Sequence, residues 1–242
     1  MTTIASASTT GMTSSTSAKY GHAYWEHLWR TAGIQYVGFF LITAVIYGVQ
    51  PQVGASVDAL AAFYNGDRTR ILIAAFFSGL NLLNLLWFVA ALRTTLADAG
   101  QDGWGAAATA SSAALGAVTF LHITVGAALA YSIAPSGVNA LTSGLNDFSW
   151  AIVVLTAFPR AMLIMAGSFG LWRAGQISNA LFAVAVVAVV LGVLGGTTWV
   201  TSGFWAPDGI YSRFVMPAIL LLWVLAVSRV LLGRTPATRA AW

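Results

Sequence analysis

Long apolar stretches separated by short polar connections dominate this chain. Six of them approach the ~20 residues that an α-helix needs to cross ~30 Å of hydrocarbon. They lie at about residues 31–49, 71–93, 106–133, 148–172, 178–201 and 212–233. Tryptophans stand near their ends, as in the aromatic belts of membrane proteins. The pattern predicts an all-α, polytopic membrane protein with a six-transmembrane-helix bundle at residues 19–233.

The segments outside the apolar stretches are predicted from their polar composition. Residues 1–18 form a Ser/Thr/Ala tract and are expected to be a disordered N-terminal tail. Residues 234–242 are expected to form a short cytoplasmic tail. Residues 134–147 are rich in Gly, Ser and Asn and are predicted to be a flexible outer loop. Spans four and five, joined by about five residues, should pack as an antiparallel hairpin.

The connection after the first span is the longest, and it contains a helix signal. Ser56 can cap a short helix that runs through Phe63, and the Asn65-Gly66 pair should end it. The apolar residues of this segment suit a helix lying on the outer membrane surface.

Composition supports a membrane protein and excludes several kinds of site. Of the 242 residues, 58% are hydrophobic and only 7% are charged, against about 25% charged in a soluble domain. The absence of cysteine excludes disulfides, iron–sulfur clusters and zinc-thiolate sites, and three histidines are too few for a histidine-box di-iron centre. We therefore expect no metal and no cofactor. The net charge of +4 is spread over short loops, which favours membrane lipid and not nucleic acid as its partner.

The basic residues predict orientation and source. With the N-terminus inside, the cytoplasmic side holds Lys19, Arg30, Arg93, Arg173, Arg229, Arg234 and Arg239, and the outer side holds Arg68, Arg70 and Arg213. The excess favours both termini in the cytoplasm. Ten arginines against one lysine indicate a GC-rich genome, so we expect a bacterial cell membrane.

Arg160 lies near the middle of the fourth span, and no predicted span contains Asp or Glu. A guanidinium stays charged at physiological pH. Placing it at the bilayer centre costs roughly 2.5–3.5 kcal/mol on insertion scales. Its surroundings are therefore the first place to look for a function.

Other polar side chains are predicted near the same depth. They are Ser78, Asn81 and Asn84 in the second span, Thr119 and His122 in the third, and Thr156 in the fourth. The spacing of three places the second-span residues on one helix face. Counted from the outer boundaries at 1.5 Å per residue, the asparagines, the histidine and Arg160 agree in depth within ~5 Å.

The chemistry of this group is that of an anion receptor. Arg160 has five donors and no acceptor. Asparagine carbonyls, neutral His122 and threonine hydroxyls can accept some of these bonds, and Pro159 frees the carbonyl of Leu155. None of them neutralises the charge. In the plainer reading, Asn and His only join helices, at about 0.6 kcal/mol per bond.

The outer stretch GASVDALAAFYNGDRTRILIAAF, followed by the asparagine-bearing second span, resembles a loose group of uncharacterised actinobacterial six-span integral membrane proteins. The resemblance covers about residues 31–233 and implies no reaction or site residue.

Three functions remain open from the sequence. The first is binding, or helping to transport, an anionic or carbonyl-bearing amphiphilic small molecule between spans two, three and four. The second is an intramembrane isomerase or cyclase with His122 as the catalytic acid or base and Arg160 stabilising negative charge. The third is an accessory subunit whose Arg160 meets a carboxylate of a membrane protein partner. A serine–histidine dyad of Ser168 and His122 is a weaker candidate.

Overall fold

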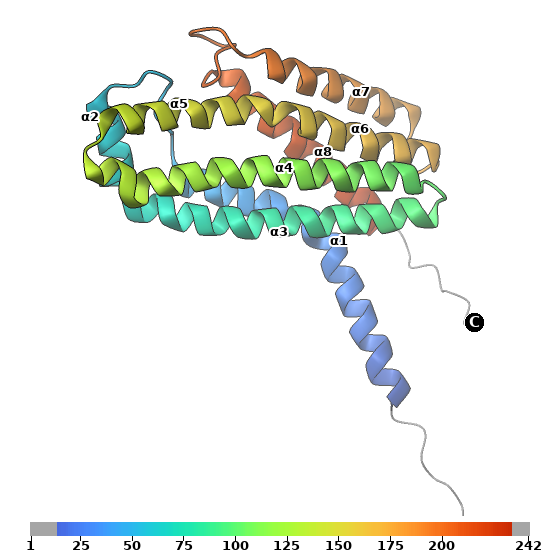
Figure 1. Cartoon of the computed structure of the whole chain (residues 1–242). Coiled ribbons are helices and arrows are strands. Elements are labelled where there is room, and N and C mark those ends of the chain that lie inside the picture. Colours follow the sequence, from blue (N-terminus) through green and yellow to red (C-terminus); the bar gives the residue numbers. More distant parts are fainter. Residues whose placement is uncertain (1–13, 234–242) are drawn as a thin grey trace, which may run out of the picture.

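In a computed structural model the described residues, 14–233, form helices and connections without a strand, and side chains are described from residue 31 onward. The main helices are α1 (Ser14–Tyr47), α2 (Val57–Ala61), α3 (Arg68–Asp98), α4 (Asp102–Ala128), α5 (Asn139–Leu155), α6 (Ala157–Arg173), α7 (Asn179–Leu194) and α8 (Met216–Leu232) (Figure 1). Short π-helical segments lie at Ala62–Gly66, Leu129–Ile133 and Tyr211–Val215, and 3₁₀ turns at Ala134–Ser136 and Gly195–Thr197.

Within residues 14–233, five helical segments are long and apolar enough to cross a membrane. They are Arg68–Asp98, Asp102–Ser136, Asn139–Arg173, Asn179–Thr197 and Tyr211–Leu232. The first predicted span corresponds to Thr31–Tyr47, a shorter apolar helix, so the count of six remains a prediction. Most of the predicted N-terminal tail and all of the C-terminal tail lie outside the described residues. The positions from Ser14 to residue 18 belong to α1.

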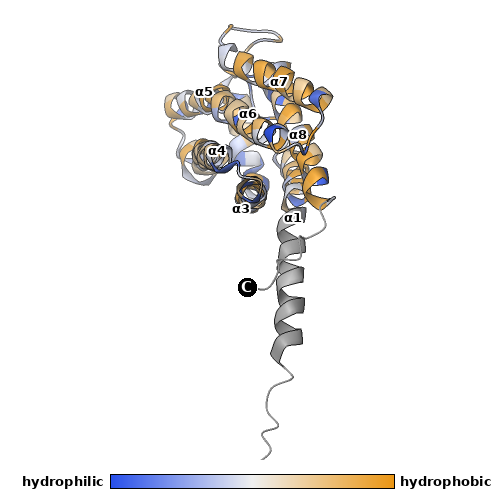
Figure 2. Ribbon diagram, turned by 90° about the vertical axis from the view of Figure 1, so that its right-hand side faces the viewer, coloured by the Kyte–Doolittle hydropathy of each residue, from blue (hydrophilic) through white to orange (hydrophobic). Residues whose placement is uncertain are grey.

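The long helices form a bundle in which each packs on specific neighbours. α1 contacts α3 and α8, α3 contacts α4, α4 contacts α6, and α6 contacts α7. Figure 2 shows the bundle approximately end-on, with α7 at its periphery. Large apolar side chains such as Phe76, Val184 and Leu222 remain exposed. Exposed apolar surface on long apolar helices is consistent with an integral membrane protein, in which it faces lipid.

The two largest apolar clusters of the described residues stabilise the bundle at different levels. The larger joins α1, α3, α4, α6 and α8 through buried side chains that include Phe88, Leu92 and Leu163. The smaller joins the segment that contains α2 to the end of α4, through Leu60, Tyr64 and other residues. This second cluster shows that the segment with α2 is buried on one side against the bundle. From the sequence we expected this segment to lie on the outer membrane surface, whereas in the structure one of its sides packs on the bundle.

Two predicted connections can be compared with the structure. The cap at Ser56 is present, because its Oγ accepts a hydrogen bond from the Ala59 N–H at 3.3 Å. The prediction of a flexible loop at residues 134–147 is wrong, since α5 (Asn139–Leu155) covers residues 139–147 of this segment. Two of its polar residues, Thr142 and Asn146, are buried. Composition alone could not reveal these buried partners.

The fourth predicted span is broken near its middle. α5 ends at Leu155 and α6 begins at Ala157, with Thr156 between them in a turn. Pro159 has no N–H to offer the Leu155 carbonyl, so a break at this level is expected. α6 and α7 pack together as the short connection between them predicted.

Candidate functional site

A cavity of about 550 Å³ lies between the helices. It is lined by residues of α1, α3, α4, α5, α6, the Tyr211–Val215 segment and α8, and most of these residues are apolar. Tyr36, Leu85 and Leu220 link its wall to the larger apolar cluster, and Ile71 to the smaller one. A volume of 300–1,000 Å³ with a mainly apolar lining and a few polar groups is typical of small-molecule sites.

Six of the seven predicted site residues line this cavity. They are Ser78, Asn81, Thr119, His122, Thr156 and Arg160. Asn84 is not among the lining residues; its amide donates to the Leu80 carbonyl at 2.9 Å. A helix turns by about 100° per residue, so positions 78 and 84 differ by about 120° around α3. The prediction that all three second-span residues share one face therefore fails at its last member.

Arg160 is only partly satisfied by its surroundings. Its Nη2 donates to Thr156 Oγ1 at 3.1 Å, one helical turn earlier. Its Nε and Nη1 are enclosed and have no hydrogen-bond partner within the described residues. Buried N–H groups without partners are costly, more so on a charged group. The guanidinium therefore gains bonds if its side chain turns toward an acceptor in the cavity that it lines.

The charge of Arg160 is not balanced within the cavity wall. Among the described lining residues none is Asp or Glu, and a second arginine, Arg213, is present. The Oδ1 of Asn81 and the Oγ1 of Thr43 are enclosed without partners. The cavity thus combines two cationic groups with neutral polar groups in a mainly apolar wall.

His122 is held by a hydrogen-bond network that the sequence did not reveal. Its Nδ1 lies 3.1 Å from Ser149 Oγ. Gln50 Nε2 donates to the same oxygen at 3.0 Å and to Asn146 Oδ1 at 3.3 Å. Ser149 and Asn146 are buried at 1% and 0% exposure, and neither lines the cavity. Residues 50 and 146 are nearly a hundred positions apart, so no local pattern could have paired them.

Arg213 was predicted to be an outer basic residue, yet it reaches the cavity. It lies in the π-helical segment Tyr211–Val215. Its guanidinium carbon is 4.6 Å from the ring centroid of Trp150, its Nε donates to the Asp208 carbonyl, and its Nη2 is enclosed without a partner. Stacking on an indole holds a guanidinium in place without neutralising it.

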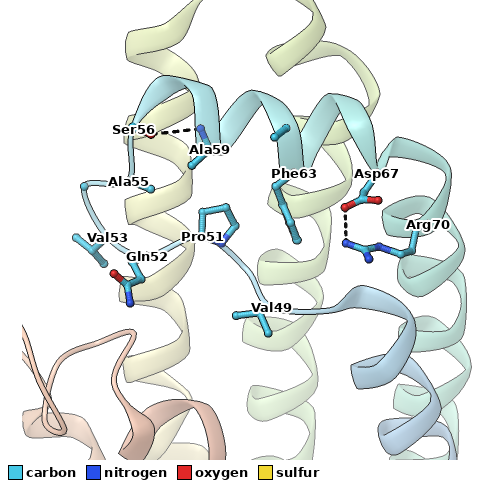
Figure 3. A pocket seen from close by; sticks show the side chains of 12 residues that line it. Val49, Pro51, Gln52, Val53, Ala55, Ser56, Ala59, Phe63, Asp67 and Arg70 are labelled. Atoms are coloured by element: carbon cyan, nitrogen blue, oxygen red, sulfur yellow. Dashed lines mark hydrogen bonds and ion pairs between the residues drawn. The ribbon is translucent and has the colours of Figure 1, made fainter.

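Residues 48–56, which we call the strap, run from the end of α1 to α2. Gly48 turns the chain with a φ of +75°, where a Cβ would be strained and would lie 3.2 Å from Arg70 Nη2. On one side of the strap lies an open pocket of about 630 Å³. Figure 3 shows this pocket with Phe63 and the ion pair of Asp67 and Arg70 in its wall. Val49 lines both this pocket and the inner cavity.

The weaker serine candidate has a packing role. Ser168 is 3% exposed, does not line the cavity, and accepts a hydrogen bond from Trp223 Nε1 at 2.9 Å. The serine within hydrogen-bond distance of His122 is Ser149, whose Oγ lies 3.1 Å from Nδ1. Nothing in this arrangement places Ser168 beside His122.

No protein-family model, no curated protein and no solved structure shows a significant match to this chain.

Proposed function

We propose that the protein binds, or helps to transport, an amphiphilic small molecule with an anionic or carbonyl oxygen. The proposal rests on Arg160, a cation in which two nitrogens have no hydrogen-bond partner. It lines a mainly apolar cavity, and none of the described lining residues is acidic. An apolar tail would replace lipid or empty space along the wall. An anionic head would supply the charge and the acceptors that Arg160 lacks.

The remaining polar groups support the same ligand. Thr156 holds one side of the guanidinium, while Asn81 and Ser78 lie on the α3 wall and Thr119 on the α4 wall. These neutral groups would orient a headgroup without competing for its charge. Their position on a cavity that is lined by several helices of one chain favours a small molecule over a carboxylate from a second protein.

The membrane arrangement belongs to this proposal. α1 packs alongside α3 and α8, and both belong to segments with the length and apolarity of membrane spans. The 17 residues Thr31–Tyr47 cover about 26 Å, and α1 as a whole has 34 residues. Because α1 packs along two spans, it should lie at the same depth in the bilayer as they do. We therefore infer that α1 is a sixth span. The distribution of the basic residues over the loops supports a cytoplasmic location for both termini, and the excess of arginine over lysine supports a bacterial cell membrane.

The test uses purified protein in lipid nanodiscs and dodecanoate as the probe. We expect saturable binding that Arg160→Met weakens about tenfold to a hundredfold, since a hydrogen-bonded charge contributes about 1.5–3 kcal/mol. The variant should fold at least as well as the parent, because it replaces an uncompensated buried charge with an apolar side chain of similar length.

Arg68→Met is the matched control. Arg68 is exposed, stacks on Tyr131 at 5.1 Å and does not line the cavity, so its loss should leave dodecanoate affinity unchanged. Equal affinity of the parent and a folded Arg160→Met variant would refute the proposed role of Arg160.

A further inference from the structure

We infer that a chain of hydrogen bonds fixes the proton of neutral His122 on the ring nitrogen that faces the cavity. The ring then donates a hydrogen bond into the cavity and selects a ligand oxygen that carries no proton. The inference deepens the proposed function and rests on it for the ligand. The positions of the hydrogens follow from the backbone carbonyl of Gln52 in the strap, because its role in a hydrogen bond is fixed. A carbonyl can only accept.

The first links set the direction of the side-chain amides. Asn146 Nδ2 lies 3.1 Å from the Gln52 carbonyl, so this end of the amide must be the nitrogen and the other end the oxygen. That oxygen also accepts from the Tyr64 hydroxyl at 2.9 Å. Burial raises the pKa of Tyr64, so its phenol keeps the proton that it donates.

The next links transmit this direction to the imidazole. Because Asn146 presents an oxygen, Gln50 must present its Nε2, since two amide oxygens at 3.3 Å would repel. Gln50 Nε2 also donates to Ser149 Oγ. With Gln50 donating to its oxygen, the Ser149 hydroxyl directs its proton to His122 Nδ1, 3.1 Å away, in the proposed arrangement. A neutral imidazole that accepts at Nδ1 carries its proton on Nε2.

The Nε2–H is directed to the cavity. His122 lines the cavity, and its Nε2 has no hydrogen-bond partner and is not among the enclosed unpartnered atoms of the described residues. Both nitrogens of His122 are then unable to accept from Arg160. The histidine and the arginine are donors in the wall of one cavity, where a ligand with a carboxylate, phosphate or carbonyl oxygen would supply the acceptor that both lack. Ser149 and Gln50 are positioning residues for this contact.

The tautomer can be measured on the protein without a ligand. With His22 and His27 changed to Gln, ¹⁵N NMR of labelled histidine reports His122 alone. At a pH where the ring is neutral, we expect the Nε2–H form. Ser149→Ala should populate both tautomers, and Ser149→Thr, which keeps the hydroxyl, should restore the Nε2–H form. An Nδ1–H ring in the parent overturns the relay, whether or not dodecanoate binds.

Dodecanoate binding tests the ligand part separately. Ser149→Ala should weaken it by about threefold to tenfold, because the donor is no longer held in one form, and Ser149→Thr should not. Unchanged affinity in Ser149→Ala overturns the contact between His122 and the ligand. An Nε2–H ring together with no dodecanoate binding by the parent supports the relay, and it refutes the proposed function.

Discussion

Single residues set how closely the helices approach one another. Gly167 on α6 faces Trp223 of α8, whose indole N–H is fixed by Ser168 at 2.9 Å. A Cβ at position 167 would lie 2.6 Å from the Trp223 ring and 3.1 Å from Leu92. The hydrogen bond prevents the ring from moving away without losing its partner. The absence of a side chain at Gly167 is therefore required by packing.

Gly167→Ala should consequently destabilise the protein by about 1–3 kcal/mol, the usual cost of overpacking. Gly116→Ala on α4 is the control, because a Cβ there meets nothing within 4 Å. Both changes raise helix propensity alike, so the difference between the two variants isolates the clash. Unfolding in mixed detergent micelles would measure it; equal stability of the two variants would contradict the packing argument.

The sequence could predict which residues line one cavity more readily than which share a helix face. Asn81, His122 and Arg160 do line one cavity, but its lining on α3 runs from Ile71 to Leu85, so their common depth stays a prediction. A face depends on rotation, whose error grows with every step, and Asn84 turned away for that reason. Whether any of these residues binds a ligand stays a prediction.

At the scale of elements, the strap and α5 act together. Asp147 of α5 accepts from the Gly54 N–H at 3.1 Å, and Trp150 donates to the Pro51 carbonyl at 2.8 Å. Asp208, from the connection before α8, accepts from the Val53 N–H at 3.3 Å. The strap is thus held from two sides, which stabilises the carbonyl from which the relay to His122 begins.

Asp147→Ala should loosen the strap. We expect amide hydrogen exchange at Gly54 to become about twofold to tenfold faster, since one hydrogen bond contributes about 0.5–1.5 kcal/mol to protection. Asp58→Ala, on the exposed side of α2, should leave it unchanged. If exchange in the strap is the same in both variants, Asp147 does not hold it.

The long helices could be predicted from the length of the apolar stretches, but the structure of the connections could not. A run of apolar residues determines a membrane-length helix with little help from its neighbours. By contrast, the polar start of α5 is helical because Thr142, Asn146 and Ser149 are buried. Gln50 and Asn146 meet only once the bundle has formed. For the same reason the network behind His122 could not be read from the sequence.

The whole molecule is a bundle in which the cavity opens between helices of both halves of the chain. α1 contributes Tyr36 and Thr43, and the segment before α8 contributes Arg213. α7 adds no lining residue and packs outside, on α6. In the six-span arrangement that we propose, α1 crosses the bilayer beside α3 and α8, on which it packs.

Membrane topology can be tested directly because the chain has no cysteine. Gly66→Cys and Gly103→Cys place single thiols where a Cβ meets nothing within 4 Å, and Ser6→Cys marks the N-terminal region. In intact cells an impermeant maleimide should label only position 66. Labelling of position 6 together with position 66, with position 103 protected, would show that α1 does not cross.

The most informative measurement is the coupling free energy between the ligand headgroup and the Arg160 side chain. Dodecanoate and dodecanol share a tail and differ in charge, so their affinities in nanodiscs form a cycle with the parent and Arg160→Met. If Arg160 binds the anionic headgroup, the parent prefers dodecanoate by about tenfold or more, and Arg160→Met abolishes this preference. A preference of equal size in both proteins would show that the buried guanidinium does not recognise the anion.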